Sequence, residues 1–173
     1  MQYIAFFRGI NVGGKNVVKM IDLKKLFTDM GFQDVRTYIQ SGNVIFSSDR
    51  GRTSLAAEIE CVFQKQFGFR SPVILRSGTE LTAILDAQPF SAAEIRQAEE
   101  EYPDVEHLYV HLFDAPLNSK NIEQACSGHN GKDKICVAEH RYICSVTKAS
   151  GIQSSPCSCP NSRRHSLSVI SRP

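Results

Sequence analysis

The first 76 residues alternate between short apolar runs and segments whose apolar residues recur at helical spacing. Gln2–Ile10 is apolar on both faces, which predicts a central strand. The next segment predicts an amphipathic helix, because its apolar residues lie three and four positions apart: Leu23, Leu26, Phe27 and Met30. Gly31 follows where a left-handed residue commonly ends a helix, so we expect the helix to stop there.

Three strands and a second helix complete this pattern. Val35–Ile39 and Val44–Ser47 predict a hairpin around a Ser-Gly-Asn turn. A helix from about Thr53 is predicted by an apolar stripe and ends at Gly68; the stripe is Leu55, Ile59, Val62 and Phe63. Pro72–Leu75 predicts the last strand. The resulting order, β-α-β-β-α-β, is that of the split βαβ or ferredoxin-like sandwich.

The second half of the chain repeats this order in part. Ser77 with Glu80, and Ser91 with Glu94, have the spacing of capping boxes and predict two helix starts. Further strands are predicted over residues 107–113, 135–137 and 142–146, and a helix over residues 117–126. The pattern is β-α-β-β without a clear closing strand.

The end of the chain has a different composition. Residues 151–173 contain seven Ser, three Pro and three Arg without a visible period, which predicts a disordered or aberrant tail. We therefore expect an α+β protein of two ferredoxin-like subdomains, the second incomplete. Its expected parts are a ferredoxin-like subdomain at 1–76, a helical connection at 77–104, a second α+β subdomain at 105–150 and the tail at 151–173.

Charge and composition narrow the choice of partners. Residues 1–76 carry 11 Lys and Arg against 6 Asp and Glu, a charge of +5, whereas residues 77–173 carry 9 against 12, a charge of −3. This asymmetry favours an anionic partner for the first half, although small domains often differ as much. No apolar run approaches the ~20 residues that a membrane span needs, so no membrane partner is expected. The six cysteines lack CxxC spacing and follow no secretory signal, which predicts reduced thiols in the cytoplasm, with Cys61 in the core.

The segment Phe7–Met20, FRGINVGGKNVVKM, is the one least suited to packing and most suited to anion contact. Its part Gly9–Asn16 comes within one residue of the phosphate-binding loop G-x4-G-K-[ST]. Asn16 replaces the Ser or Thr that would hold Mg2+, and a split βαβ order lacks the parallel sheet of a P-loop enzyme. A nucleotide-dependent enzyme is therefore the least favoured function. The chain contains no evident catalytic set, so enzymatic activity stays open, and no cofactor is indicated.

A simpler hypothesis for this segment is an anion-binding site. Gly13 and Gly14 free the backbone to direct several N–H groups toward one point. Arg8 and Lys15 would add charge-assisted bonds to a phosphate or carboxylate, and Asn11 would add a hydrogen bond. The alternative is that the two glycines only turn the chain and that Lys15 is solvated.

The turn Gln40-Ser41-Gly42-Asn43 is the second half of the predicted site. In the predicted topology the first two strands point the same way, so the loops that follow them leave the same end of the sheet. Two loops of small polar residues that meet at one edge predict a binding site. The alternative is ordinary hairpin chemistry, since Ser-Gly-Asn is a common turn.

A nucleic-acid-binding module that uses the basic half is the main alternative function. Tyr3, Phe7 and Tyr38 are candidates for base stacking on an open sheet face, but the RNA-binding octapeptide of such modules is absent. His107 and His111 share one face of a predicted strand. A third metal ligand is missing, so no metal site is expected.

Three segments together resemble a known family: RGINVGGKN at Arg8–Asn16, a methionine-led helix at Met20–Phe32 and TYIQSGNVIF at Thr37–Phe46. They are similar to the opening of the bacterial domain of unknown function 1697. The likeness covers residues 1 to about 145 and implies two α+β subdomains of ferredoxin-like character, but no reaction. Because it includes both loops, it gives the anion site about the same weight as simple turns.

The chain departs from the family after Gly151–Ser155. The segment PCSCPNSRRHSLSVISRP has no likeness to the family's closing helix and resembles a shifted reading frame or a truncated end. The identity of the ligand and the oligomeric state are not predicted.

Overall fold

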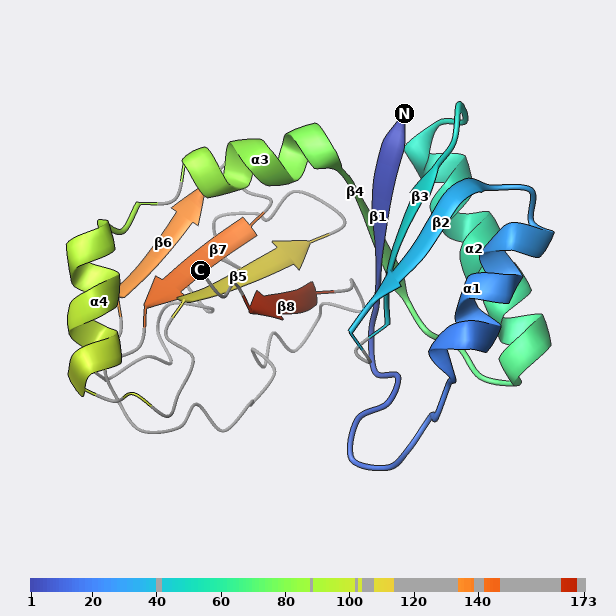
Figure 1. The fold of residues 1–173 in the computed structure, drawn as a ribbon, viewed down its shortest axis with the longest axis horizontal. Helices are drawn as coiled ribbons and strands as arrows, with labels where there is room; N and C mark the ends of the chain where they lie inside the picture. The colour runs from blue at the N-terminus through green and yellow to red at the C-terminus, as the bar shows by residue number, and fades with distance from the viewer. Residues whose placement is uncertain are drawn as a thin grey trace. The chain divides into compact units, whose positions relative to one another are not determined.

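The computed structural model describes residues 1–39, 42–87, 89–101, 103, 108–113, 134–138, 142–146 and 166–170. The chain divides into two compact units, unit 1 at Met1–Asp86 and unit 2 at Ala87–Pro173, and Figure 1 shows the elements of each. The finer, four-part division of the chain remains a prediction.

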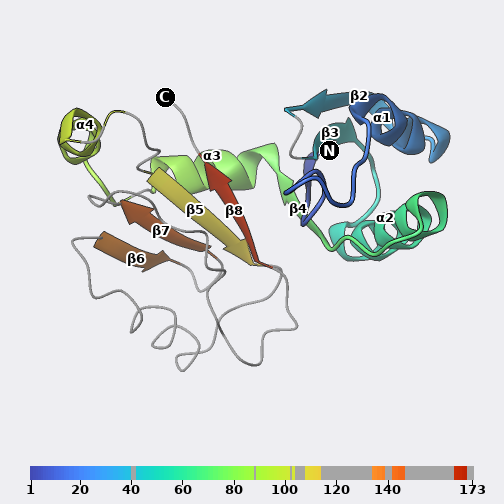
Figure 2. The ribbon, with the colours of Figure 1, turned by 90° about the horizontal axis from the view of Figure 1, so that it is seen from below.

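Unit 1 has the strands and helices in the predicted order. Its elements are β1 (Gln2–Phe7), α1 (Met20–Asp29), β2 (Gln33–Tyr38), β3 (Asn43–Ser47), α2 (Arg52–Phe67), β4 (Val73–Ser77) and α3 (Gly78–Asp86). The strands form one sheet in the order β2-β3-β1-β4, and every neighbouring pair is antiparallel. Figures 1 and 2 show α1 and α2 on the same face of this sheet. The predicted α+β class is therefore confirmed.

The helices α1 and α2 end at the predicted glycines. Gly31 has a φ of 83°, and its N–H donates to the carbonyl of Thr28 at 3.0 Å. The N–H of Phe32 donates to the carbonyl of Phe27 at 3.2 Å, which completes a Schellman ending. Gly68, with a φ of 80°, ends α2 in the left-handed conformation. Both endings need a residue that accepts a positive φ at little cost.

An aromatic cluster holds the sheet of unit 1 against its helices. The core contains Tyr3, Ala5, Phe7, Val44, Phe46, Val73 and Leu75 from the strands and Leu23, Leu26, Phe27, Leu55, Ile59 and Phe63 from the helices. The ring centroid of Phe7 lies 4.9 Å from that of Phe63 and 6.0 Å from that of Phe27. The last residue of β1 is therefore packed against both helices. Such ring pairs add about 0.5–1.5 kcal/mol beyond the burial of their area.

Both predicted capping boxes are present at the starts of α3 and α4. The N–H of Glu80 donates to Ser77 Oγ at 3.1 Å, and the Glu80 carboxylate accepts from the N–H of Ser77 at 2.8 Å. Ser91 and Glu94 make the same two contacts. Burial alone would raise the pKa of Glu80, but the Ser77 N–H and the Arg52 guanidinium outweigh it and lower that pKa below its ordinary value. Glu80 therefore links the starts of α2 and α3 as a carboxylate.

Unit 2 repeats the strand order of unit 1. Its described elements are α4 (Ala92–Glu101), β5 (Leu108–Phe113), β6 (Lys134–Ala138), β7 (Tyr142–Val146) and β8 (Ser166–Ile170). The sheet has the order β6-β7-β5-β8, again with antiparallel neighbours. The helix predicted over residues 117–126 lies outside the described residues.

The strand β8 differs from the sequence analysis, which expected no closing strand and a tail without regular structure. β8 pairs with β5, with Val110 opposite Val169. The sequence S-L-S-V-I of β8 has Leu167 and Val169 two positions apart, a strand signal too short to stand out in a Ser-rich segment. The second sheet thus has four strands.

Two smaller expectations have different outcomes. Cys61 is exposed, so its predicted place in the core is wrong. It lies two positions from the buried Ile59, on another side of α2. None of the described helices combines the length and apolar character that crossing a membrane requires.

Alanine substitutions at two glycines test the close packing of Gly42 against Ile10 and Phe7. An alanine Cβ at Gly42, where φ is 86°, would approach Ile10 Cγ1 to 2.8 Å and Phe7 Cβ to 3.2 Å, whereas at Gly68, with a similar φ, no atom lies within 4 Å. We expect Gly68→Ala to cost about 1–2 kcal/mol, the strain of the left-handed conformation. Gly42→Ala should cost about 1–3 kcal/mol more, because it also overpacks the site. Equilibrium urea unfolding measures both, and equal losses would show that the contact with Ile10 is unimportant.

Candidate functional site

The two predicted loops meet at one end of the first sheet. The N–H of Phe7, at the end of β1, donates to the carbonyl of Gly42 at 3.2 Å. The Cα of Gly42 also packs closely on the side chain of Ile10. Figure 1 shows the loop between β1 and α1 extending from this end of the sheet. The topological argument for placing the loops together is therefore correct.

The glycine segment forms a small hairpin. Val12 and Lys15 make an isolated antiparallel bridge, in which the N–H of Lys15 donates to the carbonyl of Val12 at 3.1 Å. Gly13 and Gly14 lie between them with φ of 59° and 73°. Two successive positive φ angles are typical of a type I′ turn, which explains the glycines. The N–H of Lys15 is thus bonded within the loop and is not a donor for a ligand.

The side chain of Asn11 holds this hairpin to the segment that leads into α1. Its Nδ2 donates to the carbonyl of Val18 at 3.0 Å, and its Oδ1 accepts from the N–H of Val18 at 2.8 Å. Asn16 Nδ2 donates to the carbonyl of Gly9 at 3.0 Å. Asn11 was predicted to bind a ligand directly, but these contacts give it a role within the loop.

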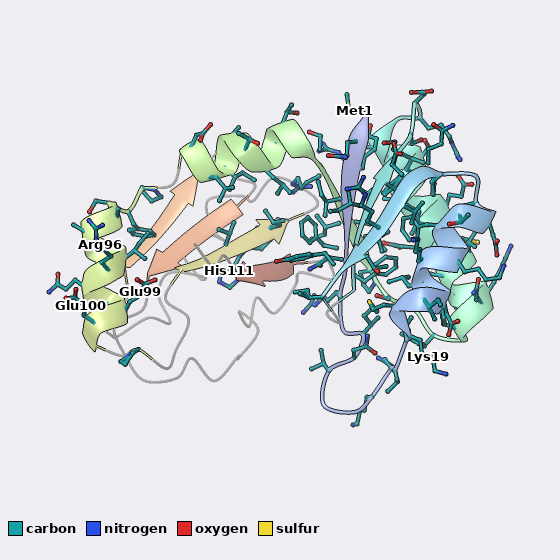
Figure 3. The ribbon with its side chains drawn as sticks, viewed as in Figure 1. Met1, Lys19, Arg96, Glu99, Glu100 and His111 are labelled. Atoms are coloured by element: carbon teal, nitrogen blue, oxygen red, sulfur yellow. The ribbon has the colours of Figure 1, made fainter. Side chains whose placement is uncertain are left out.

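A hollow of about 430 Å³ lies between the hairpin and the start of α1. It is lined by Asn11, Gly14, Val17, Val18, Lys19 and Met20. Lys19 is the N-cap residue of α1, and no side chain caps the helix there. Figure 3 labels Lys19 where the loop enters α1. The hollow therefore opens onto the amino end of a helix.

Two backbone donors and one cation, Lys19, lie at this end of α1. The N–H groups of Asp22 and Leu23 donate to the carbonyl of Lys19, each at 3.0 Å, whereas the preceding two, of Met20 and Ile21, have no acceptor among the described residues. The first N–H groups of a helix carry a partial positive charge that attracts anions.

Lysine charges add to this positive potential. Within the described part of the chain, no ion pair engages Lys15 or Lys19, and both side chains are exposed. Asp22, in the first turn of α1, is the one acidic residue there and does not line the hollow. The arrangement offers an anion two N–H groups and nearby positive charge.

The other predicted site residues have different surroundings. The backbone of Arg8 is fixed to the segment before β4: its N–H donates to the carbonyl of Pro72 at 3.0 Å, and its carbonyl accepts from Ser71 Oγ at 2.9 Å. Its side chain is partly exposed. Asn43 is the first residue of β3 and pairs with Phe6. Gln40 and Ser41 lie outside the described residues.

The P-loop geometry is not formed. In such a loop the helix begins at the lysine, but α1 begins at Met20, five residues after Lys15, and the sheet is antiparallel. A nucleotide-binding loop of this kind is therefore excluded.

Two of the three aromatic residues proposed to stack bases are buried. Tyr3 and Phe7 are 6% and 1% exposed and belong to the core between the sheet and its helices, while Tyr38 is 63% exposed. β1 is apolar on both faces, so the sequence alone did not show which face its aromatics occupy. Among the described residues, no group of three potential ligands could hold a metal ion.

Sequence analysis missed Lys19, Met20 and Val17 as lining residues. The available signal was the lysine directly before the helix, where Ser, Thr, Asp or Asn is strongly preferred. A cation at this position opposes the helix dipole. Local rules broken in this way are expected at functional or strained sites.

Three comparisons with known proteins complete this description. The family model described as "Protein of unknown function (DUF1697)" matches residues 1–142. No curated protein matches the chain. A solved structure of a conserved bacterial protein from Streptococcus pneumoniae is similar, with a TM-score of 0.67 and 23% identity, over 86% of this chain and 78% of that one. At this identity the likeness concerns the fold.

Substitution of Asn11 tests the connection between the hairpin and α1. Asn11→Ala removes both bonds to Val18 and places alanine at a φ of 55°, so we expect a loss of about 1–3 kcal/mol in the free energy of unfolding. Asn11→Asp keeps the acceptor and tolerates that φ, but it loses the donor and should be less destabilising than alanine. Urea unfolding measures both variants. A loss below about 0.5 kcal/mol for Asn11→Ala, the usual range for surface substitutions, would contradict the assigned role.

Proposed function

This chain belongs to the family described as proteins of unknown function, DUF1697, and we propose from the geometry of unit 1 that the hollow at the start of α1 binds an anion carrying a phosphate or carboxylate group. The observation that carries the proposal is Lys19 at an uncapped helix start beside a hollow. The N–H groups of Met20 and Ile21 supply directional bonds, and Lys15 and Lys19 supply charge.

The rest of the loop supports this proposal by fixing its geometry. Asn11 and Gly14, two of the residues expected from the sequence, line the hollow. Gly13 and Gly14 shape the hairpin, and Gly42 leaves room for the side chain of Ile10 where the loop leaves the sheet. Arg8 and the Gln40–Asn43 turn stay in the proposal as the outer edge of the site.

The proposal stops at binding. Of the six residues that line the hollow, Lys19 alone has an ionisable side chain. General acid–base catalysis needs a second positioned group, so no reaction is assigned.

The proposal includes a ferredoxin-like assignment for both units, supported by their matching strand orders.

A lysine substitution separates ligand binding from folding. In phosphate-free buffer of low ionic strength, Lys19→Ala should raise the free energy of unfolding by about 0.3–1 kcal/mol, because it removes a cation from the positive end of α1. Inorganic phosphate at ten times its Kd should stabilise the unsubstituted protein by about 1.4 kcal/mol, and the variant by much less at the same concentration. Unfolding at constant ionic strength, with chloride as the reference anion, gives both values.

Lys65→Ala is the matched control. Lys65 is exposed in the last turn of α2 and does not line the hollow, so its loss should leave the effect of phosphate unchanged. Phosphate stabilisation that is equal in the two variants would show that the anion binds elsewhere. No stabilisation of the unsubstituted protein would refute the proposal.

A further inference from the structure

The hollow has an apolar wall as well as a positive end. Val17, Val18 and Met20 line it together with Lys19. Val18 is buried in the core, whereas Val17 is 70% exposed. Val17 and Lys19 are two residues apart, so apolar surface and positive charge lie side by side.

The size of the hollow also exceeds the need of a bare inorganic anion. Its volume of about 430 Å³ falls within the range of about 300–1,000 Å³ of pockets that bind small organic molecules. A hydrated phosphate ion gains nothing from contact with Val17 or Met20. A ligand with a hydrocarbon part would remove this surface from water.

We propose that the ligand of this hollow is an anion with a short apolar chain, of the class of monoalkyl phosphates. This inference rests on the proposed function, since it assigns the anionic group to the end of the hollow at Lys19 and Met20. The hydrocarbon chain lies against Val17. An alkyl carboxylate shares this chemistry, and the two classes are distinguished by comparing butyl phosphate with valerate.

A series of ligands tests the contribution of the chain. Inorganic phosphate, ethyl phosphate and butyl phosphate are titrated into the full-length protein at constant ionic strength, with chemical shifts of the backbone amides as the readout. Each added CH2 should increase the affinity about twofold to fourfold, the upper value corresponding to complete burial. Butylammonium, which has the same chain with a positive charge, should not bind.

Two valine substitutions identify the surface responsible. Val17→Ser should abolish most of the gain from ethyl to butyl phosphate, measured as the ratio of the two affinities within the same variant. Val12→Ser is the matched control, because Val12 is 66% exposed on the same hairpin but does not line the hollow. The control should retain the full gain.

The possible failures are distinguishable. Equal affinities for inorganic and butyl phosphate would overturn the inference and leave the proposed anion site standing. A gain that survives Val17→Ser, or binding of butylammonium as tight as that of butyl phosphate, would also overturn it. Absence of binding by every anion in the series would refute both proposals.

Discussion

The two hydrogen bonds between Asn11 and Val18 determine the geometry of the loop end of unit 1. They join the two sides of the long loop between β1 and α1, and so hold the glycine hairpin in position relative to the start of the helix. Two further bonds hold the rest of this loop, from the N–H of Asn11 to the carbonyl of Asn16 and from Asn16 Nδ2 to the carbonyl of Gly9, and the side chains of Ile10 and Val18 are buried in the core. The hollow, its apolar wall and the exposed helix start all depend on the two bonds between Asn11 and Val18.

The amino ends of the helices differ in whether a side chain caps them and in whether the nearby cations form ion pairs. α3 and α4 begin with complete capping boxes. α2 has Gly51 as its N-cap and arginines nearby, but Arg50 pairs with Glu58 and Arg52 pairs with Glu80. Only the start of α1, among the helices described, combines a missing cap with lysines that form no ion pair in the described residues. The other described helix starts are either capped or have arginines in ion pairs, so an uncapped start beside unpaired lysines is not general in this chain. This contrast supports a ligand at the start of α1.

Much of unit 1 could be predicted because its signals are local. Glycines at positions 31 and 68, the capping box at Ser77 and the apolar stripe of α2 each determine structure within a few residues. The meeting of the two loops followed from strand direction alone. The burial of Tyr3 and Phe7 could not be predicted, because both faces of β1 are apolar and tertiary packing decides between them.

The candidate site was predicted only in part for a similar reason. Sequence patterns identified Gly13, Gly14 and Lys15, but the hairpin uses their backbone for its own turn, and Asn11 is engaged with Val18. The hollow is lined by Asn11 and Gly14 of the motif together with four residues that follow it, Val17, Val18, Lys19 and Met20. β8 was missed because five alternating residues carry little weight in a segment rich in Ser, Pro and Arg.

The central claim is that an anion binds at the start of α1. Titration of the protein with inorganic phosphate, followed through the backbone amide resonances, tests it most directly. The account predicts the largest saturable shifts at Met20 and Ile21, and much smaller ones at Thr53 and Ser54, at the start of α2, which also lacks a side-chain cap. Equal shifts at the two helix starts, or none at Met20 and Ile21, would contradict it.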